Sequence, residues 1–227
     1  MAATAPVKDP RLRIRTKMLL VLLGISLVPL VLFGYIAKRD IEEVSQYTVK
    51  ATTAIGESAA ADSAQALENL GAEMIRQKAV DVALQCGIYL RRHPGAHIEK
   101  FQADKVFQSI AVQSVGATGY TIVFDRQGVM RFHPNRELVN YDMHNWKDML
   151  PGLWALFEQT FDGSSGGGYY NWQDSDRVIR RKFMYIAPIQ GTQYMVAATT
   201  YIDEFSRPAE ETKNRIATAT DSIRGEI

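Results

Sequence analysis

The sequence has very little cysteine and almost no net charge. Cys86 is the only cysteine among 227 residues, so no disulfide can form within the chain. A single cysteine is compatible with the cytoplasm, and equally with a periplasmic domain that does not depend on disulfides. The 26 basic and 25 acidic side chains give a net charge of +1, and no basic stripe follows residue 38. We therefore expect no nucleic-acid partner.

The motifs of common catalytic and metal sites are also missing. The chain has no G-x-S-x-G, no H-E-x-x-H and no close carboxylate pair at a predicted strand end, which argues against an enzyme such as a membrane-tethered hydrolase. The glycine-rich turn at residues 162–168 lacks the Lys-Ser/Thr ending of a phosphate-binding loop. Pro94 and Gly95 separate His93 from His97, so the two imidazoles do not share a helix face. We predict no catalytic residue, no metal site and no cofactor.

A long apolar run lies near the N-terminus. Residues 18–37, MLLVLLGISLVPLVLFGYIA, are 20 residues without a charge, and as a helix they would span about 30 Å, the thickness of a bilayer core. Pro29 is tolerated better in a membrane helix than in a soluble one, and Tyr35 falls where an aromatic anchor belongs. We predict a transmembrane helix at 18–37. A cleaved signal peptide would have a shorter apolar core, and a buried soluble helix would need more polar residues than Ser26.

The charges that flank this run predict its orientation. Residues 1–17 carry five basic side chains, at positions 8, 11, 13, 15 and 17, whereas the other flank has only Lys38 and Arg39 before an acidic stretch. By the positive-inside rule, residues 1–17 form a cytoplasmic basic N-terminus and residues 38–227 are extracytoplasmic. The predicted location is the cell's inner (plasma) membrane, crossed once.

Residues 38–92 are predicted to form a stalk helix. No proline occurs from Asp40 to Arg92, and the composition is rich in Ala, Glu, Gln, Leu and Met. Apolar or small residues recur at helical spacing, at positions 41, 44, 48, 51, 55, 59, 66, 70, 74, 80, 84 and 88. Such a stripe favours a homodimer formed through the stalk, although a monomeric helix packed on its own domain would also explain it. Gly56, Gly71 and Gly87 are positions where the helix could kink.

Residues 93–206 read as a sheet domain. After a short helix or connector at 101–111, strands are predicted on both sides of the turn at 125–128, within the segment VGATGYTIVFDRQGVMRFHP at 115–134. A helix at 146–161 and the turn at 162–168 precede three more strands, at 169–173, 177–189 and 193–202. Residues 207–227 return to helix. The predicted class is α+β, with a mainly antiparallel five-stranded sheet and a closing C-terminal helix.

Five motifs in this order resemble those of Cache sensor domains, which are relatives of PAS domains. The segments 115–120, 131–135, 168–172, 181–185 and 197–205 resemble the family's G-x-T-G-Y, x-x-H-P-N, G-x-Y-x-W and K-K-x-x-Y motifs and its closing strand. The resemblance covers about residues 55–210. It implies a PAS-like sheet in a single-Cache, extracytoplasmic ligand-binding module of a histidine kinase or chemoreceptor. Such receptors usually cross the membrane again and continue into an output domain, so we expect either a fragment of a longer receptor or a sensor without its own output.

The resemblance also implies a pocket for a small molecule, such as a short carboxylate or an amino acid, between the sheet and its overlying loops. A carboxylate needs cations or paired donors in a dry cleft with aromatic walls. The predicted ligand-binding residues are the three cations and five aromatic residues Arg131, His133, Lys182, Tyr120, Trp146, Tyr170, Trp172 and Tyr185.

Other interpretations of these residues stay open at this point. Strand alternation places Lys182 and Tyr185 on opposite faces, so both can reach one pocket only if the strand is bulged. Arg131 would face solvent if Met130 and Phe132 are buried, and the tryptophans and tyrosines could belong to the core. The predicted function is a membrane-anchored sensor for transmembrane signalling. The alternative is a membrane-tethered structural or oligomerisation module without a ligand.

Overall fold

The computed structural model describes residues 14–95, 97–174 and 177–225, and for residues 223–225 only the backbone. Most of the predicted cytoplasmic stretch, residues 1–13, therefore lies outside the described residues, as do residues 175 and 176 of the predicted turn at 174–176. The chain divides into two compact units, Met1–Gly56 with Ile216–Ile227, and Glu57–Arg215.

The predicted membrane span and stalk are parts of one helix, α1 (Ile14–Arg92). Pro29 lies inside α1 without ending it, and the helix stops before Pro94 as expected. Helix α1 contains an apolar stretch of 18 residues with none of it buried, so by length and composition this helix is apolar enough to cross a membrane.

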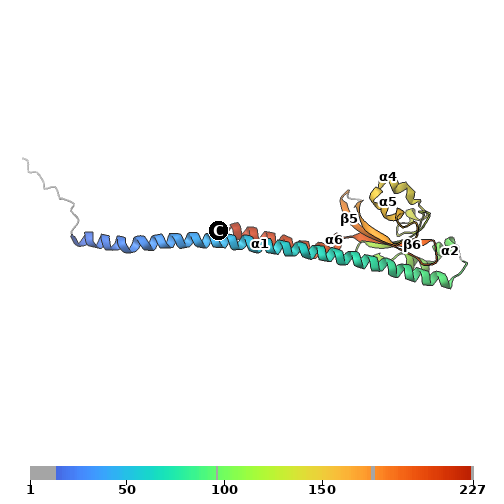
Figure 1. Cartoon of the computed structure of the whole chain (residues 1–227), viewed down its shortest axis with the longest axis horizontal. Coiled ribbons are helices and arrows are strands. Elements are labelled where there is room, and N and C mark those ends of the chain that lie inside the picture. The colour runs from blue at the N-terminus through green and yellow to red at the C-terminus, as the bar shows by residue number, and fades with distance from the viewer. Residues whose placement is uncertain (1–13, 96, 175–176, 226–227) are drawn as a thin grey trace, which may run out of the picture. The chain divides into compact units, whose positions relative to one another are not determined.

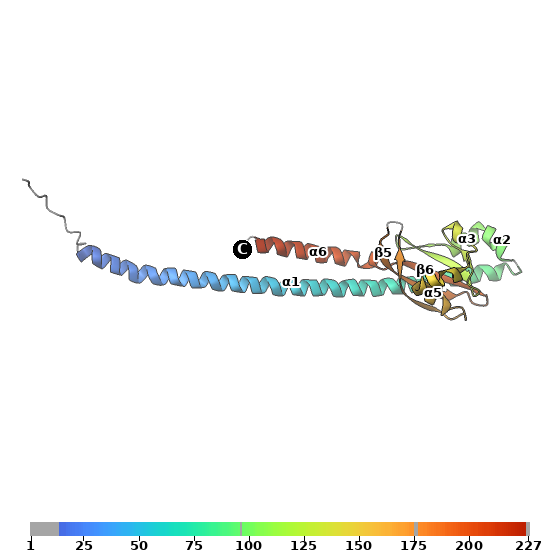
Figure 2. The same ribbon diagram turned by 90° about the horizontal axis from the view of Figure 1, so that it is seen from above.

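In the first unit, the last part of helix α6 (Asp203–Gly225) lies beside α1 (Figure 2). The hydroxyl oxygens of Thr53 and Thr220 are 3.0 Å apart. A β-carbon at Gly56 would lie 3.4 Å from Ile216, which is an ordinary van der Waals contact between the two helices.

In the second unit, the buried face of α1 is not the predicted stripe. Ile75, Ala79 and Val82 are fully buried, whereas the stripe residues Leu70 and Met74 are more than half exposed. Alanine and glycine dominate the buried face beside these larger residues, because the helix packs closely against the sheet. In this unit α1 therefore has one face packed on the domain, and the predicted stripe lies on a different, exposed face.

Helix α1 continues through all three stalk glycines, so none of them ends it. Gly71 has a packing role instead, since a β-carbon there would lie 2.3 Å from the ring of Phe205 at the start of α6.

We expect Gly71→Ala to destabilise the second unit by about 1–3 kcal/mol, because the added methyl group would collide with the partly buried ring of Phe205. In an exposed helix interior the same change normally stabilises by about 1 kcal/mol. Denaturant unfolding followed by tryptophan fluorescence would measure the difference. Gly152→Ala is the matched control, since its β-carbon would meet nothing within 4 Å. A stabilised Gly71→Ala variant would contradict this packing.

The sheet has six strands in the described part of the chain, and the α+β class is confirmed. Their order is β1-β2-β6-β5-β4 with β3 on β2, and every pairing is antiparallel. The sixth strand, relative to the predicted five, arises because Ser114 and Val115 pair with Tyr120 and Gly119. The strands are β1 (Ser114–Val115), β2 (Gly119–Asp125), β3 (Met130–Phe132), β4 (Gly166–Gln173), β5 (Ile179–Pro188) and β6 (Tyr194–Tyr201).

Helices cover both faces of this sheet (Figure 1). One face packs on α1 and on α3 (Lys105–Ala111), which follows α2 (Ile98–Ala103). The other face is covered by α4 (Trp146–Met149), α5 (Pro151–Glu158) and the short 3-10 helices η1 (Arg136–Leu138) and η2 (Met143–Asn145). Two separate hydrophobic clusters result, one on each face.

Two predicted boundaries differ from the structure. The helix expected at 146–161 is split at Leu150, because Pro151 occupies the first turn of α5 and cannot continue a preceding helix. The glycine turn ends early, since β4 already begins at Gly166. A β-carbon at Gly167 would lie 2.6 Å from the Met184 carbonyl oxygen, so glycine permits the close strand pairing there.

An irregular pairing between β2 and β3 sets the direction of the chain that follows. Val123 pairs with Phe132 and Phe124 pairs with Met130, which leaves Arg131 as an extra residue in a β-bulge. Met130 therefore packs in the cluster beneath α5, while Phe132 packs in the cluster beside α1. Alternation after the bulge returns the next residue to the α5 side of the sheet.

Candidate ligand-binding site

A cavity of about 490 Å³ lies on the α5 side of the sheet. Five of the eight predicted ligand-binding residues line it, namely Tyr120, His133, Trp146, Tyr170 and Trp172. The remaining lining residues are Ile122, Met130, Pro134, Asn135, Leu138, Leu153, Phe157, Met184 and Thr199. Most of these are apolar, and none carries a carboxylate.

Strand alternation accounts for three of the lining residues that were not predicted. Ile122 lies two residues after Tyr120, and Met184 lies two residues after Lys182, so each shares a face with a predicted residue. Thr199 is paired with both Tyr120 and Met184 across the sheet. Applying the two-residue alternation of side chains to each predicted strand would have identified Ile122, Met184 and Thr199.

The hydroxyl groups in this cavity have different hydrogen-bonding roles. Thr199 donates to the Phe183 carbonyl oxygen at 3.0 Å, so the Tyr170 hydroxyl, 2.8 Å away, donates to Thr199. The Tyr170 hydroxyl can therefore only accept a hydrogen bond from a ligand. By contrast, the Tyr120 hydroxyl and the Trp172 indole N–H have no hydrogen-bond partner among the described residues. They are the free donors of this wall.

His133 lines the cavity with a neutral imidazole. Burial lowers its pKa to about 4, with the backbone hydrogen bond to Asn135 opposing the shift and the positive charge of Lys182 adding to it. Its Nδ1 lies 2.9 Å from the Asn135 N–H and 3.2 Å from the Asn135 carbonyl oxygen. The shorter contact makes Nδ1 the acceptor and places the ring proton on Nε2. The His133 ring also stands edge-on to Tyr120, 5.1 Å between centroids.

Lys182 lies beside the cavity with its ammonium among aromatic rings. Only 4% of the residue is exposed. Its Nζ is 4.3 Å from the ring centroid of Tyr201, 5.4 Å from that of Trp172 and 5.6 Å from that of Tyr120. In the part of the chain that the structure describes, no carboxylate forms an ion pair with it. Burial lowers the pKa of Lys182, and the more distant Asp174 and Glu204 partly oppose this.

Residues 94–206 match the family model of the Cache domain. These residues form a Cache domain. The chain is also similar in structure to a periplasmic sensor domain of a chemotaxis protein, at 18% identity and a TM-score of 0.39 over 62% of this chain and 93% of that one. A methyl-accepting chemotaxis protein from Vibrio parahaemolyticus matches at 15% identity and a TM-score of 0.34, over 74% of this chain and 95% of that one.

The extracellular domain of a protein described as a histidine kinase, mmHK1S-Z2, matches at 14% identity and a TM-score of 0.36, over 48% of this chain. The chain spans only 38% of that domain's length. Comparison with curated protein sequences gives no match.

Arg131 does not line this cavity of the Cache domain. It is the extra residue of the bulge, and its Nε and Nη2 atoms each lie 2.7 Å from Asp125 Oδ2. Asp125 is fully buried, and its other oxygen accepts hydrogen bonds from the backbone N–H groups of Gln127 and Val129. Arg131 therefore neutralises the carboxylate that shapes the β2–β3 turn, and it does not face solvent as a free cation.

Tyr185 lies on the opposite face of the sheet from Lys182. The register of β5 with both neighbouring strands is regular, so no bulge brings the two residues together. Tyr185 lines a separate cavity of about 410 Å³ against α1, with Arg76, Leu84 and Gly87. Of the two residues in the predicted conflict, Lys182 is the one on the cavity side.

Tyr201 was not among the predicted site residues. Its hydroxyl donates a hydrogen bond to Asp174, which also pairs with Arg180 at 3.2 Å. Burial raises the pKa of Tyr201, and the hydrogen bond to Asp174 adds to the shift. Tyr201 thus forms one wall around the Lys182 ammonium while its hydroxyl is held elsewhere. Among the described residues, no group of three His, Cys, Asp or Glu side chains could hold a metal ion.

Proposed function

We propose that this chain is a membrane-anchored extracytoplasmic sensor whose Cache domain binds a short monocarboxylate. The observation that carries the proposal is the buried Lys182 ammonium, which has aromatic rings around it and no carboxylate partner. A buried charge without a counter-ion destabilises a folded protein, so an anionic ligand would stabilise this one when it binds. The free N–H and O–H donors of Trp172 and Tyr120 would complete the binding of the carboxylate.

The lining favours a plain carboxylate over an amino acid. An α-ammonium group needs an acidic or carbonyl acceptor, and no Asp or Glu lines the cavity. The Asn135 side-chain oxygen already accepts a hydrogen bond from the Glu137 N–H. The apolar lining suits a short hydrocarbon tail, which Met130, Leu153 and Phe157 would contact.

We further propose the domain order that the sequence predicts. Residues 1–17 are cytoplasmic, 18–37 cross the membrane, 38–92 form the stalk, 93–206 are the Cache domain and 207–227 are a C-terminal signalling helix. The apolar window of α1, none of it buried, supports the crossing, and the basic residues before it support the orientation. The exposed stripe of α1, including Leu70, Met74 and Leu84, would form a homodimer contact.

Contacts within the second unit offer a route for the signal. Glu68 of α1 accepts hydrogen bonds from Arg181 of β5 at 3.1 Å and from Ser206 of α6 at 3.2 Å. Glu204 of α6 accepts a hydrogen bond from the Ala117 N–H, next to β2, at 2.9 Å. A ligand signals only if it binds two arrangements of these elements with different affinity. Binding at Lys182 on β5 would change the energy of the contacts that join β5 to α1 and α6.

Isothermal titration calorimetry on the full chain in lipid nanodiscs tests this function. Acetate, propionate and pyruvate are compared with glycine and alanine at equal ionic strength. We expect at least one monocarboxylate to bind, and each amino acid to bind at least about tenfold more weakly than its closest carboxylate. Absence of binding by every compound would favour the alternative, an oligomerisation module without a ligand.

The affinity for a monocarboxylate is expected to rise as the pH falls from 7.5 to 5.5. The pKa of His133 is about 4 in the free protein, so the imidazole is neutral over this range. A bound carboxylate would raise that pKa, and binding would then take up a proton. We expect an increase of about three- to tenfold, measured by calorimetry at each pH.

His133→Asn should remove this pH dependence. His144→Asn is the matched control, because His144 is exposed, pairs with Asp142 and lies outside the cavity. The stability of the ligand-free protein changes with pH in the opposite direction to the affinity. It decreases as the pH falls, since the unfolded chain takes up a proton near pH 6.5 that folded His133 does not. The stability contributed by neutral His133 is thus complete above pH 6.5 and is lost as the pH falls towards 4. An affinity that stays flat in the unmodified chain would contradict the role of His133.

A further inference from the structure

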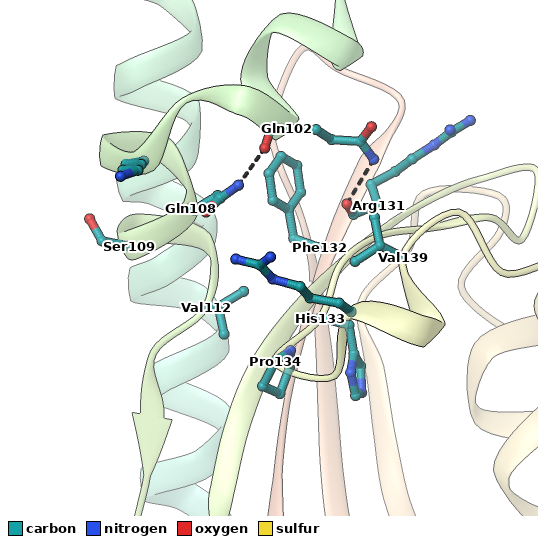
Figure 3. Close-up of a pocket in the computed structure, with 11 residues that line it drawn as sticks. Gln102, Gln108, Ser109, Val112, Arg131, Phe132, His133, Pro134 and Val139 are labelled. Atoms are coloured by element: carbon teal, nitrogen blue, oxygen red, sulfur yellow. Dashed lines mark hydrogen bonds between the residues drawn. The ribbon is translucent and has the colours of Figure 1, made fainter.

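A second cavity lies on the other side of the segment that carries His133. It has a volume of about 460 Å³ and is lined by residues from α2, α3, β3 and η1 (Figure 3). His133 and Pro134 line both cavities, so they form a shared wall. The other lining residues are Gln102, Lys105, Gln108, Ser109, Val112, Arg131, Phe132, Arg136 and Val139.

The lining of this second cavity is basic. It contains Lys105, Arg131 and Arg136 and no Asp or Glu. Asp125 neutralises Arg131. Among the described residues, Lys105 and Arg136 have no ion-pair partner, so two positive charges at the cavity are uncompensated.

Hydrogen bonds join the segments that line the cavity. Gln102 of α2 donates from Nε2 to the Arg131 carbonyl oxygen at 3.0 Å and to the Asn140 side-chain oxygen at 2.9 Å. Gln108 of α3 donates to the Gln102 carbonyl oxygen, which ties the two helices together (Figure 3). Segments held together in this way lose little free energy to ordering when a ligand binds between them.

Part of the surface between these polar groups is apolar. Phe132, Val112 and Val139 line the cavity, and Figure 3 shows Phe132 between the helices and the strand, with the two valines on either side. The volume is in the range of small-molecule sites, and so exceeds what an inorganic ion fills. A lining with two such cations and an apolar surface fits an organic molecule with two negative groups. The planar guanidinium of Arg136 can bind a carboxylate with two parallel hydrogen bonds.

We propose that this second cavity binds a small organic dianion of the dicarboxylate class, independently of the monocarboxylate site beside Lys182. Lys105 and Arg136 are the binding cations. Arg131 positions the strand and is not itself a ligand group, because its guanidinium is already bonded to Asp125.

The test is calorimetric titration of the full chain in nanodiscs with succinate, with propionate and inorganic phosphate as comparison probes. Lys105→Gln and Arg136→Gln should each weaken succinate binding at least tenfold and leave propionate binding unchanged. Lys147→Gln and Arg92→Gln, at exposed positions outside both cavities, are the matched controls and should change neither. Because Lys105 and Arg136 are also exposed, the variants should keep the unmodified melting temperature.

Lys182→Met separates the second site from the proposed monocarboxylate site. Succinate binding that survives Lys182→Met while propionate binding is lost supports two sites. Succinate binding that disappears in Lys182→Met, or that persists unchanged in both Lys105→Gln and Arg136→Gln, overturns the second site. Phosphate binding as tight as succinate binding overturns the assignment to an organic dianion, because the apolar surface would then contribute nothing.

Discussion

Lys182→Met is expected to abolish monocarboxylate binding without loss of stability. In the folded protein the Lys182 ammonium is 4% exposed and is stabilised by three aromatic rings, with no carboxylate partner in the described chain. Removing one member of a buried, hydrogen-bonded charge pair typically costs 2–5 kcal/mol of binding free energy. We therefore expect the affinity to fall by at least about 30-fold.

The effect of Lys182→Met on stability comes from removing a buried charge, not from losing a contact with the ligand. Methionine has a similar length and no charge, so it keeps the contact with Tyr201 and Trp172 and removes the cost of burying an ammonium. The lost cation–π attraction, about 0.5–2 kcal/mol, offsets part of that gain. We expect the free energy of unfolding, measured without ligand, to stay within about 1 kcal/mol of the unmodified chain or to rise.

A matched substitution makes the Lys182 result interpretable. Lys147→Met removes a lysine at an exposed position of α4 that does not line the cavity, and it should change neither affinity nor stability. If Lys182→Met binds monocarboxylates normally, the ammonium is not the ligand's partner and the proposed site is wrong. If it unfolds the protein, the lysine is part of the core and the affinity cannot be assigned to it. Lys182→Gln, which keeps a donor, then decides between these cases by its affinity.

The strand faces of the site could be predicted from alternation alone. Lys182 and Met184 share the cavity face while Tyr185 has the other, as period two requires in a regular strand. The sequence pattern could not show the bulge at Arg131, because a bulge depends on which residues of β2 and β3 pair. Without the bulge, Arg131 and His133 would share one face. With it, His133 lines the cavity and Arg131 bonds to Asp125.

The fold, like the site, could be predicted only in part. The order of helices and strands follows from apolar runs and turn residues, and the α+β class is confirmed. The buried face of the stalk was not predictable, since helical spacing alone fits both the stripe through Leu70 and Met74 and the face through Ile75 and Ala79. Only contact with the sheet distinguishes them. Likewise, Gly71 suggests a kink in isolation, and its contact with Phe205 gives it a packing role.

Arg131→Ala is expected to destabilise the Cache domain by about 2–4 kcal/mol. The substitution leaves the Asp125 carboxylate fully buried with only two backbone N–H groups as partners. Breaking a buried ion pair by removing one partner costs about 3–5 kcal/mol, and we take a lower value because 24% of the Arg131 side chain is exposed to solvent. Denaturant unfolding monitored by tryptophan fluorescence suits this test, because Trp146, Trp154 and Trp172 all lie in the second unit.

A double-mutant cycle with Asp125→Asn assigns the loss to the ion pair. Asp125→Asn removes the buried charge and keeps an acceptor for the Gln127 and Val129 N–H groups, so it should cost less than Arg131→Ala. Arg131→Ala should then cost markedly less in the Asp125→Asn background than in the unmodified chain, with a coupling of at least about 1 kcal/mol. If instead Arg131→Ala leaves the free energy of unfolding unchanged and removes monocarboxylate binding, the guanidinium is a ligand cation. The sequence-based assignment of Arg131 to the pocket would then hold, and the pairing with Asp125 would be incidental.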